Sequence, residues 1–158
     1  MPEVICKCAR LNLKPFSYIG YQLQITTQTG KGSIMFVFTP RIRDLREILV
    51  DQKLAALGDA YVNFIYSVAL SKKKREPTGA KANSRLLAEA LKKAGLKRFL
   101  PSRIDRHKQA DAVEALVVYA WVRGSMTIEE GINILGQHED MVEAFCSLIL
   151  TAMRKLDL

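Results

Sequence analysis

Apolar residues follow two different periods along this chain, and the change comes near Pro40. From Tyr21 to Thr27, β-prone residues alternate with polar ones, and after a Gly30-Lys31-Gly32 turn a second β-prone run extends from Ile34 to Phe38. Two such runs around a glycine turn are typical of a β-hairpin. A short helix is predicted before it, over residues 3–13, and Pro15 ends that helix.

After Pro40, apolar residues recur at helical spacing to the end of the chain. The third predicted helix is apolar nearly all round from Ala112 to Val122, which is typical of a buried central helix. The fourth opens with Thr127 and Glu130, the capping-box pattern. The pattern predicts helices over residues 45–70, 84–94 and 106–122, one beginning at Thr127, and one over 138–156.

The expected fold class is therefore mostly α, with an N-terminal β-hairpin. A length of 158 residues suits one domain rather than two. We expect a single domain over residues 1–158, in which 1–44 form an extension with the hairpin and 45–158 form the helical region.

Composition and the chain's first residues bear on its location. No window holds 18 uninterrupted apolar residues, so no membrane span is expected. The N-terminal residues lack the pattern of a secretory signal. Cys6, Cys8 and Cys146 do not have the spacing of a zinc site. Buried thiols in a reducing cytoplasm fit these observations best.

Positive charge is concentrated in one contiguous part of the chain. Between Lys72 and Lys108 there are thirteen Lys or Arg residues against three acids, a local charge of +10, so the other residues sum to −2. Such a basic segment is typical of proteins that bind a polyanion. A well-solvated surface is the alternative. The run Lys72-Lys73-Lys74-Arg75 leads into a Pro-Thr-Gly loop, from which basic side chains could reach phosphates, and this favours nucleic acid.

Three acids lie in helical segments that are otherwise small and apolar. Asp59 follows Gly58 in the middle of a predicted helix, where glycine costs about 1 kcal/mol relative to alanine. Close approach of a neighbouring helix or ligand would account for that glycine. Asp111 and Glu114 lie on one face at the start of the most apolar helix. Three carboxylates from two helices suit a hard cation such as Mg²⁺ or Mn²⁺. The alternatives are water-facing helix residues, a first-turn acid favoured by the helix dipole for Asp111, and a helix cap for Asp59.

Three motifs together resemble the ribonuclease III family. Leu57-Gly58-Asp59-Ala60 is similar to the family's signature helix, and the segment from Asp111 to Leu116 is similar to its Asp-x-x-Glu-Ala motif. Between them, the segment from Asn83 to Ala88, with Leu91 and Ala94-Gly95-Leu96, resembles the family's Asn-x-x-Leu-Ala helix ending in Gly-Leu. Order and spacing agree over residues 48–135.

Some positions depart from the family pattern. The larger enzymes carry a glutamate where this chain has Ala55, another where it has Gln52, and an aromatic residue where it has Ala56. The first motif is closer to the reduced Mini-III branch, which acts without a separate RNA-binding domain, and no such domain is evident here. Residues 1–44 match no part of the family.

The resemblance implies a ribonuclease III-like helical endonuclease domain that hydrolyses double-stranded or structured RNA to 5′-phosphate and 3′-hydroxyl ends. It implies Asp59, Asp111 and Glu114 as catalytic residues and ligands of Mg²⁺ or Mn²⁺. It also implies a homodimer whose signature helices meet at the two-fold axis, and no organic cofactor or membrane partner. The basic residues expected to hold the RNA backbone are Lys72, Lys73, Lys74, Arg75, Lys81, Arg85 and Lys108.

Two other functions compete with the nuclease. One is a catalytically impaired double-stranded-RNA-binding protein on the same frame, because Ala55 removes an expected carboxylate. The other is a basic helical DNA-binding module that shares the motifs by chance. The three acids favour the nuclease, since a binding protein gains nothing from negative charge beside a polyanion.

Overall fold

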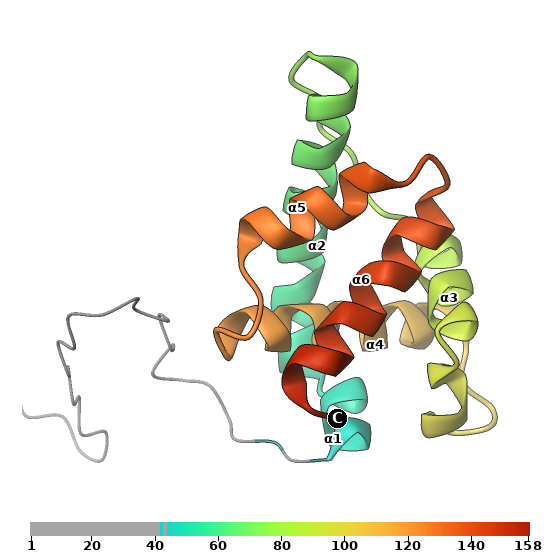
Figure 1. Ribbon diagram of the computed structural model, residues 1–158. Helices are drawn as coiled ribbons and strands as arrows, with labels where there is room; N and C mark the ends of the chain where they lie inside the picture. The colour runs from blue at the N-terminus through green and yellow to red at the C-terminus, as the bar shows by residue number, and fades with distance from the viewer. Residues whose placement is uncertain (1–41, 43) are drawn as a thin grey trace, which may run out of the picture. The chain divides into compact units, whose positions relative to one another are not determined.

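The computed structural model describes residue 42 and residues 44–158. The helix predicted over residues 3–13 and the hairpin over 21–38 lie outside these residues. Six α-helices and one short 3₁₀ helix make up the described part (Figure 1). They are α1 (Leu45–Val50), α2 (Gln52–Lys74), α3 (Ser84–Lys93), η1 (Leu96–Phe99), α4 (Arg106–Val122), α5 (Ile128–Gln137) and α6 (Met141–Leu156).

Helix α4 is the central element of the hydrophobic core, as its apolar sequence predicts. It contacts α1, α2, α3 and α6, and from Ala112 to Val122 every one of its residues except Trp121 is buried. Tyr61 of α2 stacks on Trp121, with ring centroids 4.8 Å apart. Helices α2 and α6 also contact α5, so the polypeptide after α4 returns to cover α2.

Local capping explains where the helices begin. Asp51 accepts hydrogen bonds from the amides of Lys53 and Leu54 and separates α1 from α2. The sequence predicts one helix over 45–70, and the structure corrects this, because the extended backbone of Asp51 interrupts it. Asn83 and Asp105 cap α3 and α4 in the same way. The capping box of Thr127 and Glu130 is confirmed.

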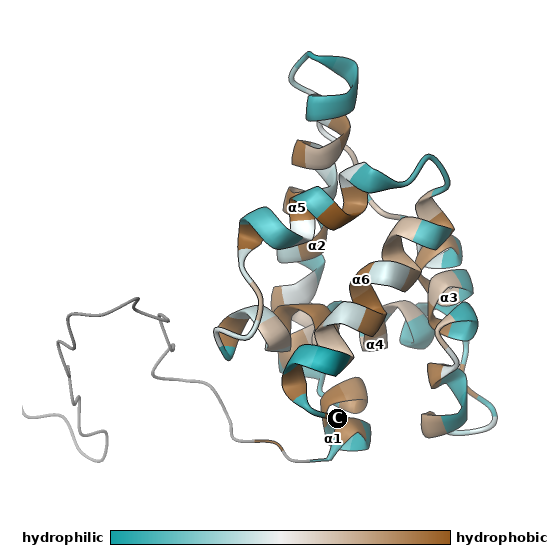
Figure 2. Cartoon of the chain, in the orientation of Figure 1, coloured by the Kyte–Doolittle hydropathy of each residue, from teal (hydrophilic) through white to brown (hydrophobic). Residues whose placement is uncertain are grey.

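Two other helix boundaries differ from the prediction. Helix α6 begins after Asp140, which caps it, whereas the pattern predicts a start at residue 138. Helix α2 continues to Lys74 and ends at Arg75, whose φ of 59° lies in the left-handed region. Lys72, Lys73 and Lys74 therefore belong to the last helical turn rather than to a loop, and Figure 2 shows this end of α2 as hydrophilic.

By length and composition, α2 is the one helix in the described part of the chain that could cross a membrane. The helix also carries Asp59, and its buried residues face α4 and α5, the helices it contacts. Packing within the domain therefore accounts for the part of its apolar composition that is buried.

Candidate active site

Gly58 brings α2 into direct contact with α4. A Cβ atom at this position would lie 2.2 Å from the carbonyl oxygen of Glu114 and 2.9 Å from the Glu114 Cβ. No other residue type has room there, so the glycine in the middle of the helix is accounted for by close packing. The crossing also sets Asp59, the next residue on α2, beside Glu114 of α4.

Glu114 is a buried carboxylate in a negative environment. Its residue is only 8% exposed. Burial, together with the charges of Asp59 and Asp111, raises the pKa of Glu114 to about 7, while the charge of Lys81 opposes this rise. Both aspartates identified from the sequence are therefore close enough to Glu114 to disfavour its negative charge.

Each of the two aspartates is paired with a lysine. Lys81 Nζ lies 3.4 Å from Asp59 Oδ1, and the Asn63 side-chain amide donates to the same oxygen at 3.2 Å. Lys108 Nζ lies 3.1 Å from Asp111 Oδ2 and donates to Gln52 Oε1 at 2.5 Å. Two ammonium groups thus partly neutralise the cluster, one at each aspartate.

A row of polar side chains on α2 fixes the segment that carries Lys81. Ser71 accepts from the amide of Thr78 at 2.8 Å, and Ser67 accepts from the amide of Ala80 at 3.0 Å. Asn63 Oδ1 accepts from the amide of Ala82 at 2.9 Å. The spacing of four residues puts Asn63, Ser67 and Ser71 on one helix face. No sequence motif identifies these three residues. Their spacing of four residues is the feature from which the sequence could have predicted a shared helix face.

The donor chemistry of the cluster fits a hard divalent cation. All three acids offer oxygen ligands, and their repulsion would be relieved by positive charge. Among the described residues, however, no group of three or more His, Cys, Asp or Glu side chains is arranged to hold a metal ion. The two aspartates are paired with lysines instead. Binding of one ion by all three carboxylates stays a prediction, and it requires the aspartate side chains to turn toward that ion.

The positions that depart from the family pattern differ in their surroundings. Ala55 is 6% exposed and belongs to the hydrophobic core. Ala56 is exposed on α2. Gln52 contacts the cluster through Lys108. A polar group therefore remains at one of the two expected glutamate positions, while the other is filled by an apolar core residue.

The seven basic residues predicted to hold RNA fall into separate groups. Lys81 and Lys108 lie at the acids. Arg85 forms an ion pair with Glu89 on α3 at 3.0 Å rather than with any of the three acids. Lys72 and Lys73 contact the α5 side of the domain rather than extending freely from a loop, and Lys74 and Arg75 are exposed.

The chain matches the protein-family model described as Ribonuclease III over residues 52–154. The match contains Gly58, the three acids and both lysines beside them. No curated protein matches the chain.

Proposed function

Because the chain belongs to the ribonuclease III family, whose members cut structured RNA, we propose that it is a metal-dependent endoribonuclease acting on double-stranded RNA. The observation that carries the proposal is the buried Glu114 carboxylate, held against α2 by Gly58 and grouped with Asp59 and Asp111. Burying Glu114 beside two other carboxylates costs stability, so the presence of all three at one helix crossing favours a functional role.

Asp59, Asp111 and Glu114 are the proposed ligands of Mg²⁺ or Mn²⁺. When bound, such an ion lowers the pKa of a water molecule and stabilises charge on the phosphate. Lys81 and Lys108 would exchange their carboxylate partners for phosphate oxygens, because both are long, exposed side chains within reach of the same acids. Hydrolysis would leave a 5′-phosphate and a 3′-hydroxyl.

We propose that RNA lies across the acids and is held by its backbone. The segment between Lys72 and Lys108 supplies the positive charge, and recognition of A-form RNA relies on shape and phosphate contacts. Duplex RNA should therefore bind more tightly than double-stranded DNA, and binding should weaken steeply as salt rises.

An exposed apolar stripe on α2 supports a homodimer. Leu57 is 37% exposed and Phe64 is 53% exposed, although both lie on a helix that is otherwise packed against the core. Ala56 and Ala60 are exposed beside them. A second copy of α2 would cover this stripe and would bring two acid clusters into one assembly.

The proposal is tested by incubating the protein with end-labelled duplex RNA, with and without Mg²⁺ or Mn²⁺. We expect cleavage only with metal, and products that a phosphate-dependent exonuclease degrades, because their 5′ ends carry phosphate. Binding without cleavage in either metal would overturn the nuclease proposal. It would favour the impaired RNA-binding protein, with the core residue Ala55 as the physical reason.

A further inference from the structure

Gly136, near the end of α5, is a helical glycine that packing does not explain. Gly58 and Gly131 each face a neighbouring helix, Gly131 with Ile65 Cδ1 3.3 Å from its would-be Cβ. At Gly136 no atom of a neighbouring element lies within 4 Å of where a Cβ would be. Its φ is not positive either, so backbone conformation does not require glycine there. Glycine weakens a helix relative to alanine, so this residue lowers stability without giving room to any described part of the protein.

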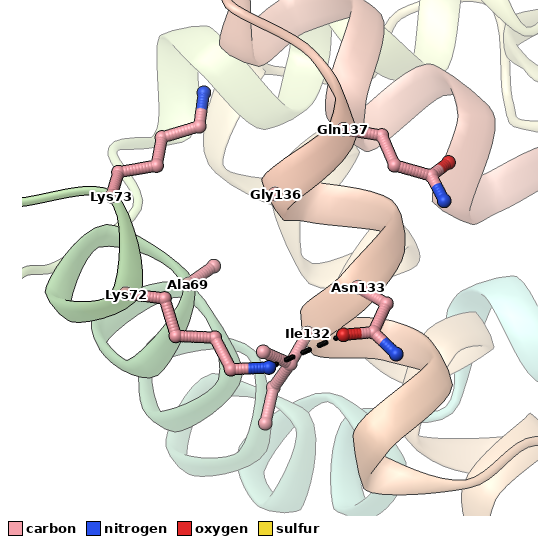
Figure 3. Close-up of a pocket in the computed structure, with 7 residues that line it drawn as sticks. All are labelled: Ala69, Lys72, Lys73, Ile132, Asn133, Gly136 and Gln137. Atoms are coloured by element: carbon pink, nitrogen blue, oxygen red, sulfur yellow. Dashed lines mark hydrogen bonds between the residues drawn. The ribbon is translucent and has the colours of Figure 1, made fainter.

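The open space beside Gly136 belongs to a cleft between α2 and α5 (Figure 3). The cleft has a volume of about 450 Å³, within the range of roughly 300–1,000 Å³ typical of ligand sites. Its lining residues come from the last turns of the two helices. They are Ala69, Lys72, Lys73, Ile132, Asn133, Gly136 and Gln137.

The polar groups of the cleft are mostly donors, and its lining contains no acid. Lys72 Nζ donates to Asn133 Oδ1 at 3.3 Å, a neutral partner that leaves the ammonium charge uncompensated. Lys73 Nζ contacts the carbonyl of His138 and lies 3.7 Å from Glu139, so it also helps to hold the end of α5. The amide of Asn133 adds a further donor, whereas the Gln137 side chain points away from both lysines (Figure 3).

We propose that this cleft is a phosphate-binding site in which the bare backbone of Gly136 gives the anion room beside Lys72. An oxyanion suits two ammonium groups and the Asn133 amide better than a neutral or cationic ligand does. We assign a backbone phosphate of the bound RNA as its occupant, which rests on the proposed function. Thirteen residues separate Asp59 from Lys72, so the site lies about 20 Å along α2 from the acids.

The chemistry of the cleft is tested without RNA, by following backbone amide signals in NMR during a titration with inorganic phosphate at constant ionic strength. We expect saturable shifts at Asn133, Gly136 and Gln137 that are lost in Lys72→Ala. Lys92→Ala, which removes an exposed lysine on α3, is the matched control and should keep them. Shifts that do not saturate, or that persist in Lys72→Ala, would overturn the site.

Gly136→Ala separates binding from folding. Its methyl group would occupy the space directly beside the backbone of residue 136, so the melting temperature should rise by about 1–3 °C while phosphate binding weakens. Affinity for duplex RNA should fall several-fold in this variant, and Lys72→Ala should reduce the slope of log affinity against log salt by about one. Gly136→Ala with unchanged phosphate and RNA binding would contradict the proposal.

The phosphate titration and the RNA-binding measurements distinguish failure of the phosphate site from failure of the proposed function. If phosphate binds in the cleft but the Gly136→Ala and Lys72→Ala variants bind RNA as the wild type does, the site is for a free anion and the RNA assignment is wrong. If wild-type protein binds no RNA at all, the proposed function fails, and the phosphate titration still decides whether the cleft is an anion site.

Discussion

Helix α2 contacts its neighbours in two different ways along its length. At Gly58 the space for a side chain is occupied by the backbone of Glu114, so α2 and α4 touch directly. Near its C-terminal end, α2 faces α5 across an open cleft, where Gly136 has no neighbour in that position. The two helical glycines therefore differ in their surroundings. Gly58 allows close packing beside the acids, whereas Gly136 faces open space beside Lys72 and Lys73.

The largest expected effect comes from placing a methyl group at the closed contact. Gly58→Ala should destabilise the protein by about 2–4 kcal/mol, because α2 and α4 must separate to relieve a contact of 2.2 Å. Chemical denaturation measures the loss. Gly136→Ala should instead stabilise the protein, because nothing lies where its methyl group would go. If both variants were destabilised, the proposed difference between the two helix contacts would be wrong.

Glu114→Gln tests the electrostatic cost of the closed contact. The raised pKa means that Glu114 supports folding below about pH 4.5 and that this support is lost as pH rises through about 7. Without metal, Glu114→Gln should therefore exceed the wild type in stability by about 1–3 kcal/mol at pH 8 and match it near pH 4.

Thermal melts in a metal-chelating buffer give this comparison. Adding Mg²⁺ at pH 8 should raise the melting temperature of the wild type and leave that of Glu114→Gln nearly unchanged. Glu47→Gln, on the exposed side of α1, serves as a control for the loss of one charge. Equal melting temperatures of wild type and Glu114→Gln at pH 8 would show that Glu114 is not electrostatically strained.

The exposed stripe of α2 contrasts with both contacts, because nothing in the described part of the chain covers it. Phe64→Lys should raise the dissociation constant of the proposed homodimer by at least about tenfold, as expected for an aromatic anchor. Analytical ultracentrifugation measures this change. Val50→Lys alters an equally exposed apolar residue on α1 and should leave the dimer intact. A monomeric wild type would contradict the homodimer.

The smallest expected effect concerns the segment that carries Lys81. Ser67→Ala removes the hydroxyl that holds Ala80 and should cost about 1 kcal/mol. Amide hydrogen exchange should become faster at Ala80 and Ala82, with little change in α5. Ser102→Ala, at an exposed position, is the matched control. Unchanged exchange at Ala80 would mean that the serine does not order this segment.

The sequence predicted the core helices well because apolar periodicity and capping residues are local features of a sequence. Helix α4 and the Thr127 capping box agree with their patterns, and Gly58 had been associated with close approach. The interruption at Asp51 was not predicted, because an aspartate between two apolar stretches does not break the helical spacing of those stretches.

For the candidate site, motif spacing identified the three acids, and in the structure the charges of Asp59 and Asp111 act on Glu114. The lysine partners could not be predicted, because they depend on contacts between segments far apart in sequence. Lys81 reaches Asp59 only because Ser67 and Ser71 fasten the intervening segment to α2. Lys72 reaches Asn133, sixty-one residues away, through the packing of α5 on α2.

Single-turnover cleavage of end-labelled duplex RNA in Mg²⁺ by wild type and Glu114→Gln, with RNA affinity measured in parallel, tests the central claim most directly. Wild type should cut the duplex, and Glu114→Gln should cut it at least roughly a hundredfold more slowly while binding it as well or better. The substitution removes a proposed metal ligand and one negative charge beside the phosphate. Equal cleavage by the two proteins would contradict the assignment of Glu114 as a metal ligand, and no cleavage by the wild type would contradict the nuclease itself.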